Sequence, residues 1–346
     1  MKKFLLALSA LLLTQVGQAK TLDHILFGSC SHQDKPMPIF DAINKDNADL
    51  FIFLGDNVYG DTENMDELRD KYRRLAAKKG FQELSTNVPT IAIWDDHDFG
   101  ENDAGREYPF KETSRAIMLD FWNEPQDSER RTRDSGIYTS YLYGENEQTV
   151  QVIMPDLRWN RPALNSIGEW GYWLQSFFNN KGPYREADAQ TSMLGEAQWQ
   201  WLEQELLKPA KVKIIASSLQ LIPEFTGWES WANFPNDRKR LFDFIAKHKI
   251  GGVVMISGDT HWGELSKYYV NNSYPFWEVT SSGLTQEWKD VSPNKHRVGE
   301  PISTVNYGFI DIDWAKSDPT IQFGLKDVKG MVTHQQSVSL SSLQFK

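Results

Sequence analysis

Three carboxylates and an imidazole crowd the end of one apolar segment of this chain. Residues 88–94 are apolar enough for a strand that is buried on both faces, and Asp95, Asp96, His97 and Asp98 follow directly. The carboxyl ends of strands are the usual position of a site in an α/β sheet. Such a cluster repels itself unless positive charge lies within it. The segment therefore predicts a buried strand that ends at a cation site.

Three more segments repeat this arrangement. Buried-strand patterns at 24–28, 49–54 and 252–257 are followed by side chains that can bind metal, namely Cys30, Asp56 with Tyr59, and Asp259 with His261. A single Gly-Asp pair after a strand is more often a turn than a ligand. Carboxylates, an imidazole, a phenol and a thiol at four strand ends instead predict a coordination sphere for clustered cations.

The N-terminus has the pattern of a secretion signal. Lys2 and Lys3 precede an apolar run at 4–13, and Gly17-Gln18-Ala19 forms a small-residue cleavage site. The apolar run is too short to span a bilayer, and no other segment approaches the roughly 18 apolar residues that a membrane helix needs. We expect a signal peptide at 1–19 and one exported domain at 20–346, periplasmic or secreted, without a membrane span in the mature chain.

The chain is acidic and contains one cysteine. Its 47 Asp and Glu residues outnumber its 37 Lys and Arg residues, for a net charge of −10, which argues against a nucleic-acid partner. Bound cations would neutralise part of this charge. Cys30 cannot form an intrachain disulfide. It could pack as a small apolar residue, but its place at a strand end favours a role as a metal ligand.

Strand and helix patterns alternate from about residue 23 to about residue 257, which predicts an α/β fold. The expected helices cover residues 36–44, 64–78, 111–122, 195–207 and 237–248. After residue 258 the chain turns to short strand patterns, which suggest a second sheet packed on the first within one domain. These strands are expected at 264–269, 275–281, 307–314, 320–325 and 335–340.

A less regular insertion is expected at 158–190. It is rich in aromatic residues, namely Trp159, Trp170, Tyr172, Trp173, Phe177, Phe178 and Tyr184. These side chains could form a lid or substrate platform, or they could roof the core of the insertion. We favour the roof, because an irregular insertion needs apolar anchors of its own.

Taken in order, the runs at 27–30, 54–61, 94–98 and 257–261 resemble the alkaline phosphatase D family of calcineurin-like metallophosphoesterases, which is related to the purple acid phosphatases. The similarity spans roughly Ile25 to Lys267. Further landmarks lie at 102–105, 156–158 and 195–199. The resemblance implies a four-layer αββα sandwich with metals at the loops of the sheet edges.

The resemblance also implies a ligand set. Asp56 would be a bridging carboxylate and Tyr59 a phenolate on Fe(III). Asp96 and Asp259 stand where wider relatives have an amide and an imidazole, so the second position becomes oxygen-rich and favours Ca²⁺ over Zn²⁺. The expected cofactors are Fe(III) and one or two Ca²⁺. The full set of metal-binding candidates is Cys30, Asp56, Tyr59, Asp96, Asp98, Asn102, Asp259 and His261.

One ligand of the relatives has no counterpart in the sequence. A histidine usually follows a later strand, but Ser217, Ser218 and Gln220 follow Ile214-Ile215-Ala216 here. The replacement for that ligand is therefore left open.

The implied activity is hydrolysis of a phosphate ester by metal-activated hydroxide. His97 is expected to protonate the leaving group or steady the transition state. Arg158 is expected to fork two donors onto phosphate oxygens. The substrate would be a small-molecule, lipid or polymer phosphate ester.

Two alternatives stay open. A calcium-binding adhesive or carbohydrate-binding module would also be acidic, exported and rich in tryptophan. A phosphodiesterase acting on lipids, nucleotides or cell-wall polymers would keep the same metal site, and the sequence does not decide between monoesters and diesters. The chain contains no Walker A loop, no HExxH and no GxGxxG fingerprint, so nucleotide-cradling and zincin functions have no support.

Overall fold

The computed structural model describes residues 20–179, 181–270 and 273–346. The expected signal peptide lies outside the described residues. Among the described residues, no helix is long and apolar enough to cross a membrane.

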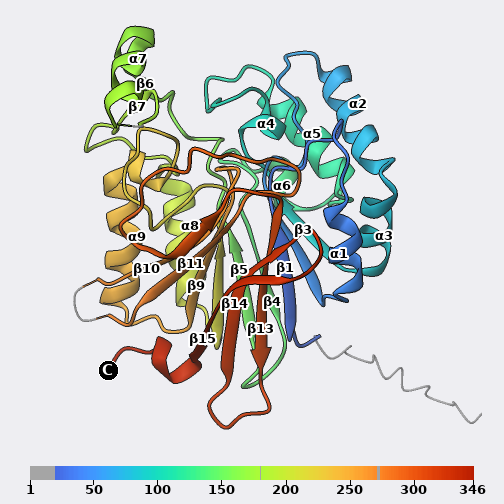
Figure 1. Cartoon of the computed structure of the whole chain (residues 1–346), viewed down its shortest axis with the longest axis vertical. Helices are drawn as coiled ribbons and strands as arrows, with labels where there is room; N and C mark the ends of the chain where they lie inside the picture. Colours follow the sequence, from blue (N-terminus) through green and yellow to red (C-terminus); the bar gives the residue numbers. More distant parts are fainter. Residues whose placement is uncertain (1–19, 180, 271–272) are drawn as a thin grey trace, which may run out of the picture.

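Two large sheets form the centre of the molecule (Figure 1). The first has the strand order β15-β14-β13-β1-β2-β3, in which β1, β2 and β3 are parallel and β13 runs antiparallel to β1. Its strands are β1 (His24–Gly28), β2 (Leu50–Leu54), β3 (Thr90–Ile93), β13 (Asn306–Asp313), β14 (Thr320–Asp327) and β15 (Val332–Ser339).

The second sheet has the strand order β12-β10-β11-β9-β8-β5-β4. The strands β11, β9, β8 and β5 are parallel, and antiparallel strands flank them on both sides. The bounds are β4 (Thr139–Tyr143), β5 (Val150–Met154), β8 (Val212–Ala216), β9 (Val253–Ser257), β10 (Gly263–Tyr268), β11 (Phe276–Ser281) and β12 (Arg297–Ile302).

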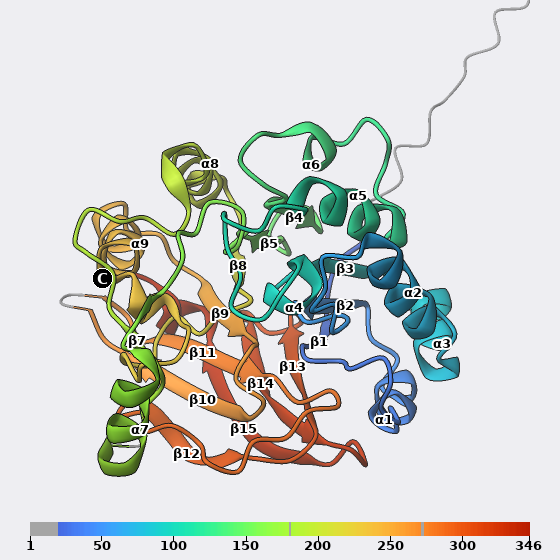
Figure 2. The same ribbon diagram turned by 90° about the horizontal axis from the view of Figure 1, so that it is seen from above.

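Helices cover the outer face of each sheet (Figure 2). The first group lies outside the first sheet and comprises α1 (Ile39–Lys45), α2 (Met65–Ala76), α3 (Lys79–Asn87) and α5 (Lys111–Phe121), while α8 (Gly195–Leu207) and α9 (Pro235–Lys247) lie outside the second. The sheets face each other where β11 contacts β13 and β14. The four-layer αββα sandwich is thereby confirmed.

Burial on both faces explains the apolar strands. All five residues of β2, β8 and β9 are buried, because one face meets the helices and the other meets the opposite sheet. The expectation that the late strands form a second sheet by themselves is wrong. They extend both sheets instead, since β13 pairs with β1 and carries β14 and β15, while β11 pairs with β9 and carries β10 and β12.

The expected helices are present with one difference. The span predicted at 64–78 corresponds to α2, which ends at Ala76. Lys78 has extended dihedral angles (φ −71°, ψ 120°) and caps a separate helix, α3, which the sequence pattern did not predict. Two short helices, α4 (Asp96–Phe99) and α6 (Glu129–Thr132), complete this half of the chain.

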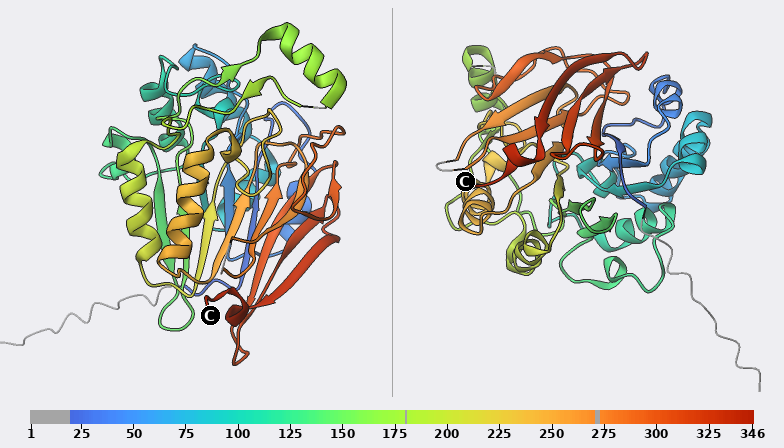
Figure 3. Two further views of the ribbon diagram at one scale, coloured as in Figure 1. Left: turned by 90° about the vertical axis from the view of Figure 1, so that its left-hand side faces the viewer. Right: turned by 90° about the horizontal axis from the view of Figure 1, so that it is seen from below.

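The insertion contains β6 (Asn165–Ser166), α7 (Gly168–Asn179) and β7 (Tyr184–Arg185). Trp159 is buried, as a roof over a core requires. The favoured interpretation is wrong for the aromatic residues of α7, because Trp170, Trp173, Phe177 and Phe178 are exposed. Figure 3 shows α7 standing at the edge of the molecule, on the side where the parallel strands end.

Candidate metal centre

The carboxyl ends of the parallel strands from both sheets meet at one place. Cys30 follows β1, Asp56 follows β2, Asp95 and Asp96 follow β3, and Asp259 follows β9. Several trios of these and neighbouring side chains have ligand atoms within 4.8 Å of one another. Packing of the two sheets against each other therefore brings together residues that lie more than 200 positions apart in the sequence.

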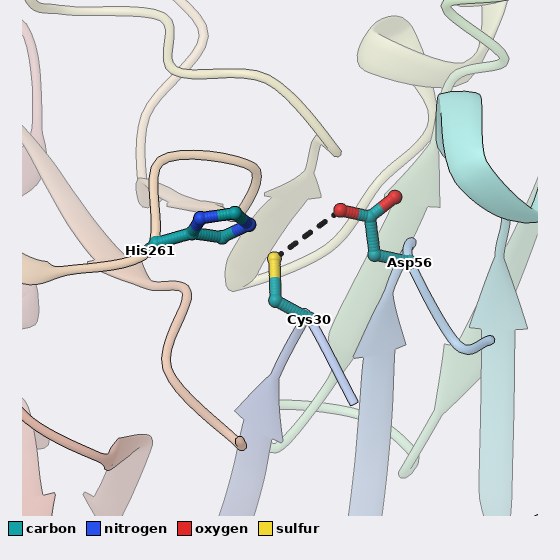
Figure 4. A group of neighbouring side chains, drawn as sticks. All are labelled: Cys30, Asp56 and His261. Atoms are coloured by element: carbon teal, nitrogen blue, oxygen red, sulfur yellow. Dashed lines mark hydrogen bonds between the residues drawn. The ribbon is translucent and has the colours of Figure 1, made fainter. Parts of the chain in front are cut away.

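The first trio consists of Cys30, Asp56 and His261 (Figure 4). The Cys30 thiol donates a hydrogen bond to Asp56 Oδ2 at 3.3 Å. His261 enters from the loop before β10, and its Nε2 lies 3.0 Å from the Tyr59 hydroxyl. A thiol, a carboxylate, an imidazole and a phenol thus share one end of the site.

Three further trios consist mainly of carboxylates, and Asp96 belongs to each of them. They are Asp56 with Asp96 and His97, Asp95 with Asp96 and Asp259, and Asp96 with Asp103 and Glu229. Buried oxygen atoms of Asp56 (Oδ1), Asp95 (Oδ2) and Asp96 (Oδ1) have no hydrogen-bond partner. Unpartnered buried carboxylate oxygens are costly, so this donor set fits bound cations.

The backbone at the site is strained. Of the ten non-glycine residues with positive φ in the described chain, six lie in or beside these trios, at Cys30, Asp56, Asp61, Asp103, Asp259 and His261. A left-handed conformation costs a non-glycine residue roughly 1–2 kcal/mol. Strain of this kind concentrates at functional sites, where the surrounding fold holds the residues in place.

Gly55 allows the loops after β2 and β3 to approach each other. It has φ +99°, and a Cβ atom there would lie 2.5 Å from Asp95 Cβ and 2.8 Å from Asp95 N. Only glycine fits this position without displacing the backbone. The close contact brings Asp56 beside Asp95 and Asp96.

Arg158 lies beneath the acidic trios and is wholly buried. Its Nε donates to Asp95 Oδ1 at 2.5 Å, its Nη1 donates to Glu229 at 2.9 Å, and its Nη2 lies 3.6 Å from Asp96 Oδ1. Two of its three guanidinium nitrogens donate to carboxylates, Nη2 has no hydrogen-bond partner, and the residue does not line the cavity described below. A direct contact between Arg158 and phosphate therefore stays a prediction.

Two other predicted ligands, Asp98 and Asn102, belong to none of the trios. Asp98 accepts hydrogen bonds from the backbone N–H groups of Asp56, Asn57 and Asp95 and from the Asn57 side chain. Its oxygens therefore connect the loops after β2 and β3 by hydrogen bonds. Asn102 lines the cavity, and its neighbour Asp103 belongs to a trio.

The two histidines of the site have opposite electrostatic environments. Burial lowers the pKa of His261 to about 4. Burial also acts to lower the pKa of His97, but the charges of Asp96, Asp56 and Asp61 outweigh it and raise the pKa to about 11. His97 Nδ1 lies 2.7 Å from Asp61 Oδ1, so Asp61 fixes the orientation of the ring.

The acidic groups and the thiol also titrate abnormally. Burial raises the pKa of Cys30 to about 12, although hydrogen bonds from Ser282 and Ser29 act in the opposite direction. Burial raises the pKa of Asp95 to about 6 against the lowering effect of Arg158, and it raises the pKa of Asp259 well above its ordinary value. Without cations, the cluster would hold protons, and cation binding would release them.

A cavity of about 230 Å³ opens onto the acidic trios. This volume is below the ~300–1,000 Å³ of pockets that enclose drug-sized ligands, so it suits a small charged group with its counter-ions. The lining residues are Asp56, Asp96, His97, Asn102, Asp103, Trp228, Glu229, Asp259, Thr260, His261, Trp262 and Trp288.

Four contributors were not among the predicted site residues. Asp95 and Asp103 lie within runs that the sequence singles out, whereas Glu229 lies in an irregular stretch after β8 that carries no periodic signal. Ser218, also after β8, donates to Asp95 Oδ1 at 2.7 Å. Ser218 thus follows the strand after which the relatives have a histidine, and here it binds Asp95 at the end of β3.

Comparison with known sequences identifies related proteins. A family model described as PhoD-like phosphatase matches residues 25–323. Alkaline phosphatase D of Bacillus subtilis (strain 168) is 23% identical over 327 residues, which cover 79% of this chain and 52% of that protein. The chain thus spans about half the length of this curated relative.

Comparison with solved structures gives the same fold. The structure of PhoD matches with a TM-score of 0.67 at 17% identity and covers 93% of this chain and 72% of that chain. A dimetal phosphatase from Danio rerio matches with a TM-score of 0.55 at 12% identity and covers 94% of this chain and 100% of that chain. At these identities the likeness concerns the fold alone.

The position of Arg158 predicts a large effect on stability. We expect Arg158→Met to lower the free energy of unfolding by about 3–5 kcal/mol, because Asp95 and Glu229 would lose their buried counter-charge. The matched control is Arg69→Met, which removes an exposed ion pair with Asp66 and should cost ~0–1 kcal/mol. Urea denaturation of metal-replete protein measures both. Equal small losses would refute the counter-charge role.

The unpartnered carboxylate oxygens predict that cations stabilise the fold. A cation at about 100 times its Kd adds about 2.7 kcal/mol, so chelation should lower the thermal midpoint by several degrees, at roughly 2–4 °C per kcal/mol. Asp96→Asn should shrink the difference between chelated and cation-loaded protein. Asp66→Asn, which changes an exposed acid on α2, should leave it intact. A chelator-insensitive midpoint in the wild-type protein would contradict this prediction.

Proposed function

Because the chain belongs to the PhoD-like phosphatase family, we propose that it is a metal-dependent hydrolase of phosphate esters. The observation that carries this proposal is the convergence of carboxylates and imidazoles from the strand ends on one small cavity, with the Cys30 thiol buried beside Asp56 and His261. This donor set fits cations, and the cavity volume suits a phosphoryl group. The test is turnover of a panel of phosphate monoesters and diesters, combined with metal analysis of the purified protein.

We propose Fe(III) at the end of the site formed by Cys30, Asp56, Tyr59 and His261. A thiol, a phenol and an imidazole favour a transition metal over Ca²⁺. We propose Ca²⁺ beside Asp56, Asp96 and Asp259, where oxygen donors dominate. Asn102, Asp103 and Glu229 extend this oxygen-rich end along the cavity wall and leave room for one or two calcium ions.

When bound, the cations would activate a water as nucleophile and offset the charge on the phosphoryl oxygens. The chain's own residues would orient the reacting groups. Asp61 holds His97 by Nδ1, so Nε2 is the nitrogen left to deliver a proton to the leaving group at the cavity wall. Arg158 would act as a positioning residue, because it fixes Asp95 and Glu229 without reaching the cavity.

Export is also a proposal, and it rests on the signal-like pattern at 1–19. N-terminal sequencing of the protein recovered from the periplasm or the medium would test it. A mature N-terminus at Met1 would refute cleavage.

An adhesive or carbohydrate-binding module is the weaker alternative. Such a module presents its binding residues on an accessible face, whereas Asp56, Asp95 and Asp96 are almost completely buried. A phosphodiesterase remains compatible with the same site. Relative turnover on the ester panel distinguishes monoester from diester preference.

His97 is predicted to act on the leaving group. His97→Asn should lower turnover by about 10²–10⁴, and the loss should be smaller for esters with activated leaving groups, which depart with little help from a proton donor. Metal content should stay near that of the wild type.

Two outcomes would contradict the role of His97. Equal losses on activated and unactivated esters would exclude proton donation. Loss of iron or calcium from the variant would make His97 a ligand, which its distance to Asp56 and Asp96 also permits.

The proposed iron site predicts colour. A ferric phenolate or thiolate should give a charge-transfer band in the visible spectrum of the metal-replete protein. Tyr59→Phe should shift or abolish the band, whereas Tyr141→Phe, on β4, should leave it unchanged. Colourless wild-type protein without iron would refute this assignment.

A further inference from the structure

Helix α7 presents its apolar side to solvent. Trp170, Trp173, Leu174 and Phe177 follow the i, i+3, i+4, i+7 spacing of one helix face, and Phe178 extends it. Their exposed fractions are 81%, 59%, 49%, 74% and 71%. The rings of this face contact one another, with Trp173 stacked on Phe177 at 6.2 Å between centroids. A surface helix normally directs such a face toward the core.

The other face of α7 holds the helix to the body of the protein. Gln175 Nε2 donates to the Gly182 carbonyl at 2.9 Å, and the Tyr172 ring contacts Trp228 at 5.9 Å. The base of the insertion is fixed by backbone hydrogen bonds from Gly182 to Thr226 and from Tyr184 to Gly227. The outward direction of the apolar face is therefore fixed by contacts on the opposite side of the helix.

We propose that the apolar face of α7, formed by Trp170, Trp173, Leu174, Phe177 and Phe178, docks the protein on the surface of a lipid bilayer. Tryptophan and phenylalanine on one side of a short helix are typical of helices that lie in the bilayer interface. The proposal goes beyond ester hydrolysis and does not depend on it.

The local charge suits this occupant. The whole chain carries a net charge of −10, whereas residues 168–190 are close to neutral, with three acids, Glu169, Glu186 and Asp188, and two bases, Lys181 and Arg185. Lys181 and Arg185 are exposed and can reach lipid headgroups beside an inserted aromatic face. Most of the acidic surplus that would repel an anionic membrane thus lies outside the insertion.

The size of the face argues against a second copy of the chain. Each of the five side chains offers at most ~150–250 Å² when wholly covered. At their partial exposure the five side chains present roughly 500–800 Å², which does not exceed the ~800 Å² per partner of a standard protein interface, so a second copy would need contacts beyond this face. In Figures 1 and 3, α7 also stands out from the domain as a ridge, a shape that can enter a bilayer interface without a complementary groove.

The same insertion reaches the metal centre. From Tyr172, ring contacts continue through Trp228 to Trp288 and then to His261, at centroid distances of 5.9, 6.3 and 6.4 Å. The Tyr184 hydroxyl donates a short hydrogen bond to Asp103. A bilayer docked on α7 would therefore lie on the side of the molecule where the cavity opens.

Vesicle flotation of the full metal-replete chain tests the proposal, with vesicles of phosphatidylcholine alone and mixed with phosphatidylglycerol. We expect the wild type to float with the vesicles. The double variant Trp170→Ser, Phe177→Ser should bind the vesicles at least about tenfold more weakly, because two interfacial side chains are lost. Its turnover of a soluble ester should stay unchanged, since neither residue lines the cavity.

The matched control is the double variant Leu142→Ser, Met331→Ser, which removes two exposed apolar side chains from β4 and from the turn between β14 and β15. It should float like the wild type. Wild-type protein that binds neither vesicle type, or equal binding by both double variants, would overturn the proposal.

Two further measurements separate other occupants. If sedimentation velocity shows a dimer that the α7 variant abolishes, the face binds a second copy and the bilayer proposal is wrong. Flotation in excess chelator should persist, because docking does not need the metals. Flotation lost with chelator but kept in the α7 variant would assign lipid binding to the cavity and overturn the proposal. A protein that floats but hydrolyses no ester would refute only the proposed function.

Discussion

The mutual repulsion of buried carboxylates is the constraint on which this structure depends. Asp56, Asp95 and Asp96 are buried together beside the half-buried Asp259, and this arrangement is unfavourable unless positive charge compensates it. Arg158 supplies compensation from beneath, and unpartnered oxygens face the place where cations fit. The fold thus provides fixed counter-charges in Arg158 and His97, and the unpartnered carboxylate oxygens fit cations for the rest of the compensation.

The two sheets are the means by which this cluster is held. Parallel strands of both sheets end on the same side, so each loop contributes one or two donors at a fixed position. The left-handed backbone at Cys30, Asp56, Asp259 and His261 turns the chain sharply just after each strand. The strands behind these turns are extensively buried, and their burial stabilises the fold enough to offset the energetic cost of the turns.

The insertion relates the metal centre to the outside of the molecule. Its polar contacts face the body and its apolar side chains face solvent, which reverses the usual arrangement of a surface helix. Tyr184 reaches Asp103 from the same insertion, so the exposed helix and the cavity belong to one connected structure. The small cavity and the exposed apolar face of α7 thus lie on the same side of the molecule.

The sequence by itself determined the buried strands, the acidic residues at their ends and the α/β class, because hydrophobic runs and the residues that follow them are local properties of the chain. The resemblance of four short runs was enough to predict the four-layer sandwich. The tertiary structure decided which of these side chains face one another. Asp98 faces backbone N–H groups, Arg158 is enclosed by Asp95 and Glu229, and Glu229 joins the centre from an irregular segment. Side-chain direction at a strand end depends on loop dihedral angles and on contacts between distant segments, and neither leaves a periodic signal in the sequence.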